Sequence, residues 1–377
     1  MCFCVTVSYA AVYLQSRGYS NTELGIVLAV GNILGALLGP AMSARIDRKD
    51  TLGPHSFLPF VLLAQAGLLA LLSILRGKST AVSVVYVLFM ALALSVNSLN
   101  LKLYVDLSHG GARVDYGVSR GIGSLAYVGV SMCLGALIQR ISVDILPWAG
   151  LLITALQALS ARLLRRASPV IVRSGDPGEN RSRSVVGFLL ENRRFSVLLF
   201  GTVLIFFAHN TVVNFFINLT VHAGGDTRTM GLLNAAMAFV EIPVIMFYGR
   251  LRGKHSHASA LRLAFPFFIA KAFAFAYAGT IPLLFAALLL QAPSFALYTA
   301  AIVNYVDEKL PQEDSAKAQS LAFSMTTAGS VLASVLSGWN YDRFGVPNTL
   351  LIAAVACAFG SLTAITGLKG SKQTIKE

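Results

Sequence analysis

Residues 116–139 of the chain read YGVSRGIGSLAYVGVSMCLGALIQ. One charged residue, Arg120, stands just inside an apolar run that is rich in glycine. A charge at such a depth is costly in a bilayer, so it usually faces a polar interior. Four polar side chains recur at i, i+4, i+7 and i+11 on one helical face, namely Arg120, Ser124, Tyr127 and Ser131. The stretch predicts a membrane helix whose polar face lines a cavity; the alternative is that Arg120 reaches the headgroups.

The composition indicates a membrane protein. Of the 377 residues, 55% are hydrophobic and 12% are charged, about half the charged fraction of a soluble domain. The apolar residues fall in runs near the ~20 that a helix needs to cross a bilayer. We predict an all-α membrane protein with twelve transmembrane helices, near residues 1–15, 22–44, 56–75, 80–101, 117–139, 143–164, 196–220, 229–248, 262–278, 281–304, 317–338 and 347–367. The first is short, so we expect either a start upstream of Met1 or a short helix.

The basic residues are distributed unevenly between the loops. Most of the 30 lysines and arginines, which give a net charge of +13, fall in alternate connections. Because positively charged loops stay in the cytoplasm, we predict a multi-pass protein of the plasma membrane with both termini cytoplasmic. The charge therefore indicates topology, and we expect no nucleic acid among the partners.

One polar stretch, residues 165–195, interrupts the apolar pattern with prolines, glycines and many arginines. It predicts a cytoplasmic linker between an N-terminal six-helix half, residues 1–164, and a C-terminal six-helix half, residues 196–377. Two six-helix halves joined by a long cytoplasmic loop indicate two structural repeats.

Small residues form stripes at intervals of four on two of the predicted helices. They are Gly31, Gly35 and Gly39 on one, and Ser330, Ser334 and Gly338 on the other. Such stripes let helix backbones approach closely in a membrane. We expect packing contacts, with the lining of a pathway as the alternative.

Two enzyme motifs match by letter and are discounted. Gly117–Gly121 fits G-x-S-x-G and Gly121–Ala126 fits G-x-G-x-x-A. Both require a strand before a helix, whereas here they lie at the mouth of a membrane helix. We expect no enzyme activity and interpret these glycines as helix-packing positions.

The cysteines give no sign of a metal site or a disulfide framework. The four are Cys2, Cys4, Cys133 and Cys357, and their spacing matches no metal-ligand pattern. We predict neither a metal nor a cofactor.

Asparagines form polar faces inside two predicted spans. Asn97 and Asn100 lie one turn apart, and Asn210, Asn214 and Asn218 recur every four residues near His209. Amide side chains both donate and accept hydrogen bonds, which suits a hydroxylated or polar solute. The alternative is hydrogen bonding between helices, worth ~0.6 kcal/mol each.

Two ionisable residues lie well inside spans. Glu241 is the one acid and Lys271 the one lysine in such a position. A carboxyl group in an apolar interior can accept and release a proton, as a proton-coupled carrier requires. We consider two roles equally, proton coupling or a structural bridge from Glu241 to Lys271 or to another cation.

A short charged loop follows the second predicted helix. Gly39 is followed by Asp47, Arg48 and Lys49. The loop is a candidate cytoplasmic gate, although turn formation and the positive-inside rule alone could produce it.

Over almost its full length the chain resembles the major facilitator superfamily. More narrowly, it resembles the branch of proton-linked oligosaccharide, nucleoside and phenylpropionate permeases. The segment 116–127 is similar to that branch's Y-G-x-x-R-x-x-G-S-x-G-Y signature, and LLQAPSFALY at 289–298 to its L-L-H-G-x-x-F-x-L-Y. EIP at 241–243 is similar to its eighth-helix pattern, and Gly39 with Asp47 and Arg48 is a partial match to the superfamily's loop motif.

The resemblance implies a twelve-helix carrier in which Arg120 contacts the substrate. The chain departs from the branch at two places. Gln291 stands where a histidine is frequent, and Asn97, Asn100 and Lys102 stand where sugar permeases place an acid. Glu241 is then the remaining acid that could carry proton coupling.

We therefore predict a transporter of a small polar organic solute, sugar-like or nucleoside-like, working by alternating access with proton symport. The expected substrate-binding residues are Arg120, Asn97, Asn100, Tyr127, Asn210, Asn214 and Gln291. The expected partners are that solute, protons and the lipid bilayer, with the protein functional as a monomer. The alternatives are a uniporter or exporter of the same fold, or a non-transporting membrane sensor or scaffold.

Overall fold

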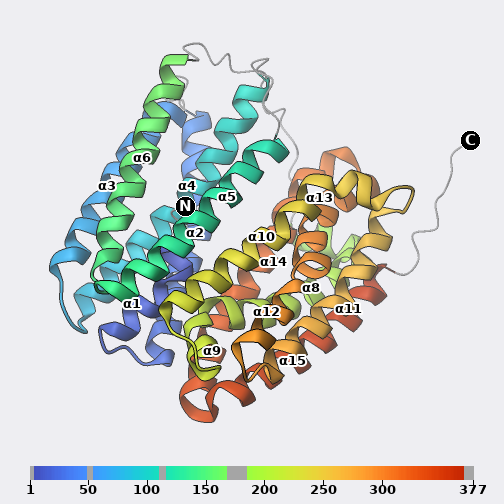
Figure 1. Cartoon of the computed structure of the whole chain (residues 1–377). Coiled ribbons are helices and arrows are strands. Elements are labelled where there is room, and N and C mark those ends of the chain that lie inside the picture. The colour runs from blue at the N-terminus through green and yellow to red at the C-terminus, as the bar shows by residue number, and fades with distance from the viewer. Residues whose placement is uncertain (1–3, 49–53, 110–115, 168–184, 369–377) are drawn as a thin grey trace, which may run out of the picture.

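The computed structural model describes residues 4–48, 54–109, 116–167 and 185–368, and within these ranges the chain is helical without a strand (Figure 1). The first group comprises η1 (Cys4–Ser8), α1 (Ala10–Ser16), α2 (Asn21–Arg48), α3 (Pro54–Ile74), α4 (Thr80–His109), α5 (Tyr116–Arg140) and α6 (Ile145–Ala167). The second comprises α7 (Val185–Glu191), α8 (Arg193–Asn214), α9 (Phe216–His222), α10 (Thr227–Arg252), α11 (His257–Tyr277), α12 (Ile281–Leu289), η2 (Ala292–Ala296), α13 (Leu297–Lys309), α14 (Gln312–Leu332), η3 (Ala333–Ser337) and α15 (Gly338–Leu368).

These helices confirm the predicted all-α membrane architecture. In the described part of the chain, nine helical segments are long and apolar enough to span a membrane. One of them, Lys317–Leu368, contains two predicted spans, because Gly345 at φ 74° breaks α15. A positive φ is accessible to glycine at little cost. The first predicted span is short, as expected, and consists of η1 and α1. Helix α7 falls inside the segment predicted as a linker.

Helix α10, which carries Glu241, begins at a side-chain cap. The Asp226 carboxylate accepts hydrogen bonds from the Thr229 amide at 2.8 Å and the Thr229 hydroxyl at 2.7 Å. The bond from the Thr229 amide holds the pKa of Asp226 below its usual value. The cap is therefore charged at neutral pH and complements the positive end of the helix.

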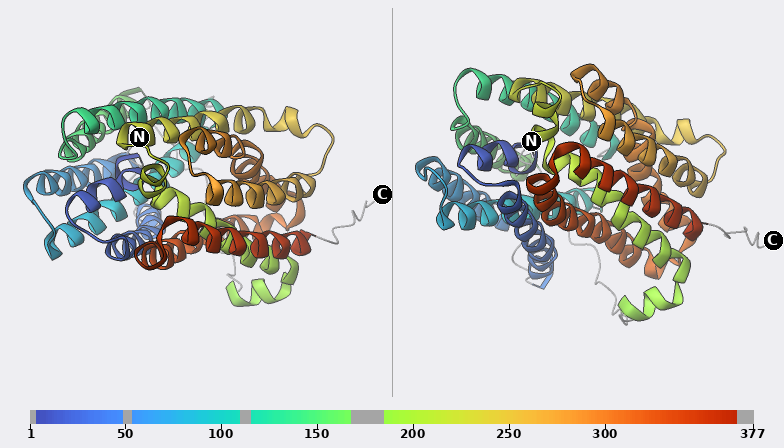
Figure 2. Two further views of the ribbon diagram at one scale, coloured as in Figure 1. Left: turned by 60° about the horizontal axis from the view of Figure 1, so that its bottom comes forward. Right: turned by 90° about the horizontal axis from the view of Figure 1, so that it is seen from below.

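Helices α1–α6 form one group and α8–α15 the other, and the two groups touch along two seams (Figure 2). In one seam α5 lies along α10, and in the other α2 lies along α14, η3 and α15. Backbones approach closely at both. A Cβ placed at Gly231 would lie 2.7 Å from Ser131 O, and one at Gly25 would lie 2.0 Å from Ser334 O. Only glycine fits at these positions without a shift of the backbone.

The two groups meet at one end of the molecule and diverge at the other. In Figure 1 they come together at the bottom, near α1, α9 and α15, and spread apart toward the top, where α6 and α13 end. Two asparagines of α2 form hydrogen bonds across the second seam: Asn21 Nδ2 donates to Asp342 Oδ1 at 2.8 Å, and Asn32 Nδ2 lies 3.4 Å from Ser330 Oγ.

The glycine stripe on α2 packs against α4, as predicted. A Cβ at Gly31, Gly35 or Gly39 would lie 2.7–2.8 Å from Met90, Leu94 or Ser98 respectively. The interpretation of the α5 glycines was wrong for Gly123, which has nothing within 4 Å of its Cβ position. Gly121 does lie against Met246 of α10, at 3.2 Å. Sequence spacing identifies small residues, but not which of them face another helix.

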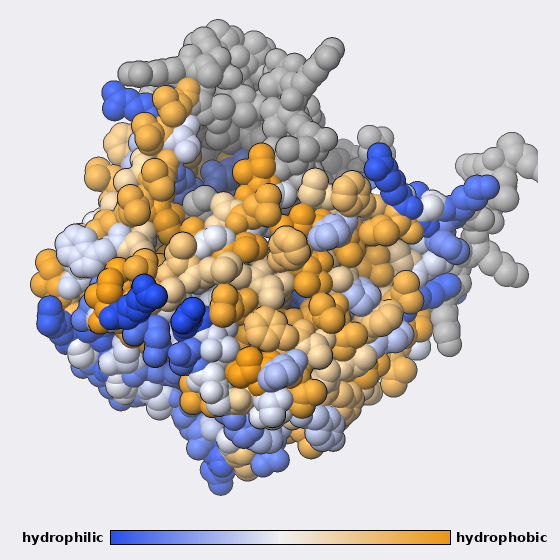
Figure 3. Space-filling view, in the orientation of Figure 1, coloured by the Kyte–Doolittle hydropathy of each residue, from blue (hydrophilic) through white to orange (hydrophobic). Residues whose placement is uncertain are grey.

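Large apolar side chains cover the outside of the bundle. Leu37, Phe60, Leu63, Leu152 and Phe359 are each at least 60% exposed. The face in Figure 3 shows a broad apolar band, with hydrophilic residues gathered along its lower edge. A surface of this kind is stable in contact with lipid, which agrees with a multi-pass membrane protein.

Candidate functional site

A chain of hydrogen bonds links four polar side chains inside the second group of helices. Lys271 Nζ of α11 donates to Gln291 Oε1 at 2.8 Å, and Gln291 Nε2 donates to Glu241 Oε1 of α10 at 2.8 Å. Lys271 Nζ also lies 3.3 Å from His209 Nδ1 of α8. The four residues come from four separate helical segments, so only the fold brings them together.

Gln291 is held at the end of α12 by an irregular turn. Pro293 has no N–H and cannot continue the α-helical bonding pattern. The Ala296 amide instead donates to Gln291 O, five residues back, at 3.1 Å. The result is the π-helical turn η2, a feature that is frequent at functional sites. The turn separates α12 from α13 at the level of the polar chain.

The two middle residues of the polar chain are shielded from water, whereas Glu241 and His209 are half-buried. Lys271 is 3% exposed and Gln291 is 1% exposed. The Lys271 ammonium also lies 4.6 Å from the centroid of the Phe268 ring, within the range of a cation–π contact. Opposite charges in an apolar interior are retained only if each is hydrogen-bonded, and the two ends of the Gln291 amide provide one bond to Lys271 and one to Glu241.

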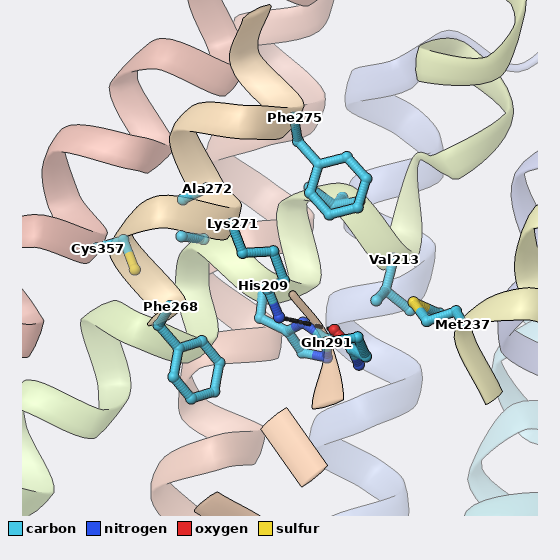
Figure 4. Close-up of a pocket in the computed structure, with 11 residues that line it drawn as sticks. His209, Val213, Met237, Phe268, Lys271, Ala272, Phe275, Gln291 and Cys357 are labelled. Atoms are coloured by element: carbon cyan, nitrogen blue, oxygen red, sulfur yellow. Dashed lines mark hydrogen bonds between the residues drawn. The ribbon is translucent and has the colours of Figure 1, made fainter. Parts of the chain in front are cut away.

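A small cavity adjoins the polar chain (Figure 4). It measures about 10 Å³ and is bordered by His209, Lys271, Gln291 and Cys357, among others. That volume is close to what a single water needs. The side chains in Figure 4 therefore leave room for a water beside Lys271, and not for an organic solute.

The structure places Gln291 between the two predicted ionisable residues. The structural alternative paired Glu241 with Lys271 or another cation, and the observed hydrogen bonds connect Glu241 to Lys271 through the amide of Gln291. The proton-coupling role of Glu241 and Lys271 stays a prediction. His209 completes the chain. In the sequence it stands out only as a neighbour of the three asparagines. The sequence feature that points to His209 is that it is a lone imidazole inside an apolar span.

The three asparagines of the seventh span have different surroundings. Asn214, 2% exposed, donates from Nδ2 to Ser334 Oγ at 2.9 Å. Asn218 donates to Asn21 Oδ1 of α2 at 2.6 Å. Asn210 is half-buried and donates to Phe206 O of its own helix. The interhelical alternative thus describes Asn214 and Asn218, whereas the side chain of Asn210 bonds within its own helix.

The candidates on the first group of helices are only partly described. The Tyr127 hydroxyl lies 2.7 Å from Ser8 Oγ, and Asn97 and Asn100 are exposed on α4. Gly39 packs against α4. The side chains of Arg120, Asp47 and Arg48 lie outside what the structure describes, so their roles in substrate binding and gating stay predictions.

We expect Asn214→Leu to destabilise the protein without changing substrate affinity. The substitution removes the bond that ties α8 to η3 through Ser334, a loss of ~0.6 kcal/mol and at most ~1.7 kcal/mol. The melting temperature of the detergent-purified protein should fall while the KM of uptake stays the same. Asn210→Leu is the matched comparison, with KM rising and little change in melting temperature. A higher KM for Asn214→Leu would show that this amide contacts the solute.

The fold and this site define a class of protein, the polytopic membrane carriers that are built from two helix bundles with polar residues in their interior. The chain belongs to the MFS_1 like family, whose model matches residues 2–352. It is a transporter and not an enzyme. No curated protein matches the sequence at a significant level.

Solved transporter structures share the fold. The crystal structure of the nucleoside transporter NupG matches with a TM-score of 0.79 at 15% identity, covering 98% of this chain and 96% of NupG. A point mutant of NupG matches with a TM-score of 0.78 at 16% identity, covering 97% and 96%. A bacterial homologue of the iron transporter ferroportin, in an inward-facing state, matches with a TM-score of 0.71 at 12% identity, covering 96% and 94%. At these identities the likeness concerns the fold alone.

Proposed function

We propose that this secondary transporter moves a small polar organic solute together with protons. The observation that carries the proposal is the hydrogen-bonded chain of Glu241, Gln291, Lys271 and His209, whose two middle members, Gln291 and Lys271, are buried. A non-transporting scaffold would be more stable with an apolar interior, because isolated buried charges are costly in a membrane. A carrier that binds and releases protons needs such groups.

The hydrogen bonds suggest how a proton could be coupled to movement. Gln291 Nε2 donates to the carboxylate of Glu241, and that bond is strong because the acceptor is charged. Protonation of Glu241 removes the negative charge and weakens the bond. Since Glu241, Lys271 and Gln291 stand on α10, on α11 and at the end of α12, the change alters how these three helices are held together.

The positions of the two helix groups favour alternating access. The halves touch at the end where Asn21 and Asn218 lie and diverge at the other. If the positive-inside rule holds, the diverging end is cytoplasmic. We infer that the conformation is inward-facing, that residues 1–164 and 196–377 move as halves, and that both termini lie in the cytoplasm of a plasma-membrane protein.

The cargo is proposed to be a solute of the sugar or nucleoside kind. Nucleosides are the substrate named for NupG, which shares the fold. Asn97, Asn100 and Asn210 offer amide groups that suit hydroxylated compounds. Arg120, Tyr127 and Gln291 remain proposed contacts.

Uptake into proteoliposomes tests the proposal. The purified protein is reconstituted, and radiolabelled sugars and nucleosides are offered with and without an inward proton gradient. We expect at least one solute to accumulate above its external concentration only when the gradient is present. Equilibration without accumulation would support the uniporter alternative, and no uptake of any solute would support a sensor or scaffold.

A further inference from the structure

A second cavity lies between α8, the η2–α13 segment and α14. It measures about 160 Å³. Four aromatic residues contribute to its walls, namely Phe206, Phe295, Tyr298 and Phe323. Three hydroxyls belong to lining residues, those of Tyr298, Thr299 and Thr326; the other lining residues are apolar, and none is charged. The cavity, called the ring pocket below, is thus suited to an uncharged group with limited hydrogen bonding.

The aromatic walls are fixed by their packing. Phe206 contacts Tyr298 with ring centroids 5.3 Å apart and Phe295 with centroids 6.1 Å apart, both tilted. Phe206 and Tyr298 are almost fully buried, whereas Phe323 is 52% exposed and forms the open side. Rings prefer neighbouring rings at 4.5–7 Å. A planar ring that enters here meets aromatic faces and edges already in place.

The volume matches one ring system. An apolar cavity of about 150 Å³ accommodates benzene, and the ring pocket is of that size. A simple sugar carries a hydroxyl on nearly every carbon, and the three hydroxyls of the lining residues cannot satisfy them all. Burying hydroxyls without partners costs free energy, so the ring pocket disfavours a sugar ring and favours an aromatic or heteroaromatic one.

The ring pocket shares a wall with the polar chain. The His209 imidazole stacks on Phe295, with ring centroids 4.7 Å apart and planes at 22°. The same imidazole meets Phe206 edge-on at 5.8 Å and reaches Lys271 Nζ through Nδ1. A ring bound in the pocket therefore lies one side chain away from the groups proposed to carry the proton. The π-helical turn η2 begins directly after Gln291 and contributes Phe295 to this wall.

We propose that the ring pocket binds the uncharged planar ring of the transported solute, so that substrates carry an aromatic or heteroaromatic ring in addition to their polar part. This inference rests on the proposed function and names the chemical class of its solute. Phe206, Phe295 and Tyr298 select the ring. Thr326, at the edge of the pocket, forms a hydrogen bond with a polar group at the edge of the bound ring. The Thr326 hydroxyl donates to Phe323 O at 2.7 Å, which leaves its oxygen lone pairs available as acceptors.

The test compares solutes in matched pairs, with and without a ring. Uridine is paired with ribose, and 3-phenylpropanoate with propanoate. Binding is measured as thermal stabilisation of the purified wild-type protein in lipid nanodiscs. We expect the ring-bearing member of at least one pair to stabilise the protein, with its ringless partner binding about tenfold or more weakly, equivalent to ~1.4 kcal/mol. Equal stabilisation within both pairs, or none by either ring compound, would overturn the proposal.

Two variants test whether the ring compound binds in the ring pocket. Thr326→Trp fills the ring pocket from its half-buried edge, and Thr327→Trp adds the same side chain one position along, where it does not line the pocket. Both threonine hydroxyls bond to the same carbonyl, Phe323 O. Thr326→Trp should weaken binding of the ring compound about tenfold or more, and Thr327→Trp should leave it within about twofold of wild type. Equal loss in both variants, or in neither, would contradict the assignment.

The outcomes separate the two proposals. If the protein does not transport, the ring compounds still stabilise it in a pocket-dependent manner, although no solute accumulates in proteoliposomes. If the ring pocket is wrongly assigned, proton-driven accumulation of the ring compound persists in Thr326→Trp.

Discussion

Glu241→Gln is expected to abolish solute accumulation driven by a proton gradient and to leave exchange of solute for solute intact. The glutamine keeps the shape of the side chain and an oxygen that accepts from Gln291 Nε2, but it cannot take up or release a proton. A carrier that lacks its proton-binding group can still cycle with solute bound on both sides. The measurement is uptake of labelled solute into proteoliposomes, with an acidic exterior in one arm and preloaded unlabelled solute in the other.

A surface carboxylate provides the control. Glu23 pairs with Lys78 at 2.7 Å, and both side chains are well exposed. Glu23→Gln should leave both arms of the experiment unchanged. If Glu241→Gln retains full gradient-driven accumulation, Glu241 has a structural role and the proton enters elsewhere.

Lys271 adds a second, independent test of the same chain. Removing one partner of a buried, hydrogen-bonded charge pair costs ~3–5 kcal/mol, because the other charge is left unbalanced. Lys271→Met alone should therefore lower the melting temperature strongly. The double variant Glu241→Gln with Lys271→Met should recover part of that loss, since neither charge remains. Additive destabilisation would show that the two groups do not interact through Gln291.

The sequence was sufficient for the fold and for part of the site. Runs of apolar residues near the length of a span, together with alternating basic loops, predict the helices, because bilayer thickness and charge placement act on local sequence. Glu241, Lys271 and Gln291 were recognised as unusual for their positions, and the structure joins them in one chain.

Other features depend on contacts that local sequence does not encode. The insertion of Gln291 between Glu241 and Lys271 follows from the π-helical turn at Pro293. The ring pocket combines an aromatic residue of α8 with aromatic residues of η2, α13 and α14, which lie about 90 to 120 residues further along the chain and look like ordinary core residues in the sequence. Gly123 and Gly121 belong to the same motif, yet only Gly121 meets a neighbouring helix.

Asp342→Ala is expected to loosen the closed end of the protein and shift the population toward a state that is open there. Asp342, from the second group of helices, accepts four hydrogen bonds at the start of α2 in the first group. The donors are Asn21 N at 3.1 Å, Asn21 Nδ2 at 2.8 Å, Thr22 N at 2.7 Å and Thr22 Oγ1 at 2.6 Å. A carboxylate at a helix N-terminus satisfies amides that otherwise lack partners, and this one does so across the seam between the halves.

The size of the shift follows from the kind of bond that is lost. Hydrogen bonds to a charged group are worth ~1.5–3 kcal/mol when well shielded, and each 1.4 kcal/mol changes a population ratio about tenfold. Because these bonds are exposed, we expect about a tenfold shift, with Asp342→Asn intermediate. Spin labels at Ser142 and Gly279, in loops of the two halves, report the separation as a distance distribution.

Asp144 offers a matched control for that measurement, and the comparison decides whether the contact between halves is what matters. Asp144 pairs with Arg17 at 2.5 Å, but both residues belong to the first group of helices. Asp144→Ala therefore removes a carboxylate without cutting a bond across the seam, and its distance distribution should match that of the wild type. A distribution for Asp342→Ala that is indistinguishable from that of Asp144→Ala would mean that the close glycine contacts at Gly25 and Gly338 hold this end shut by themselves.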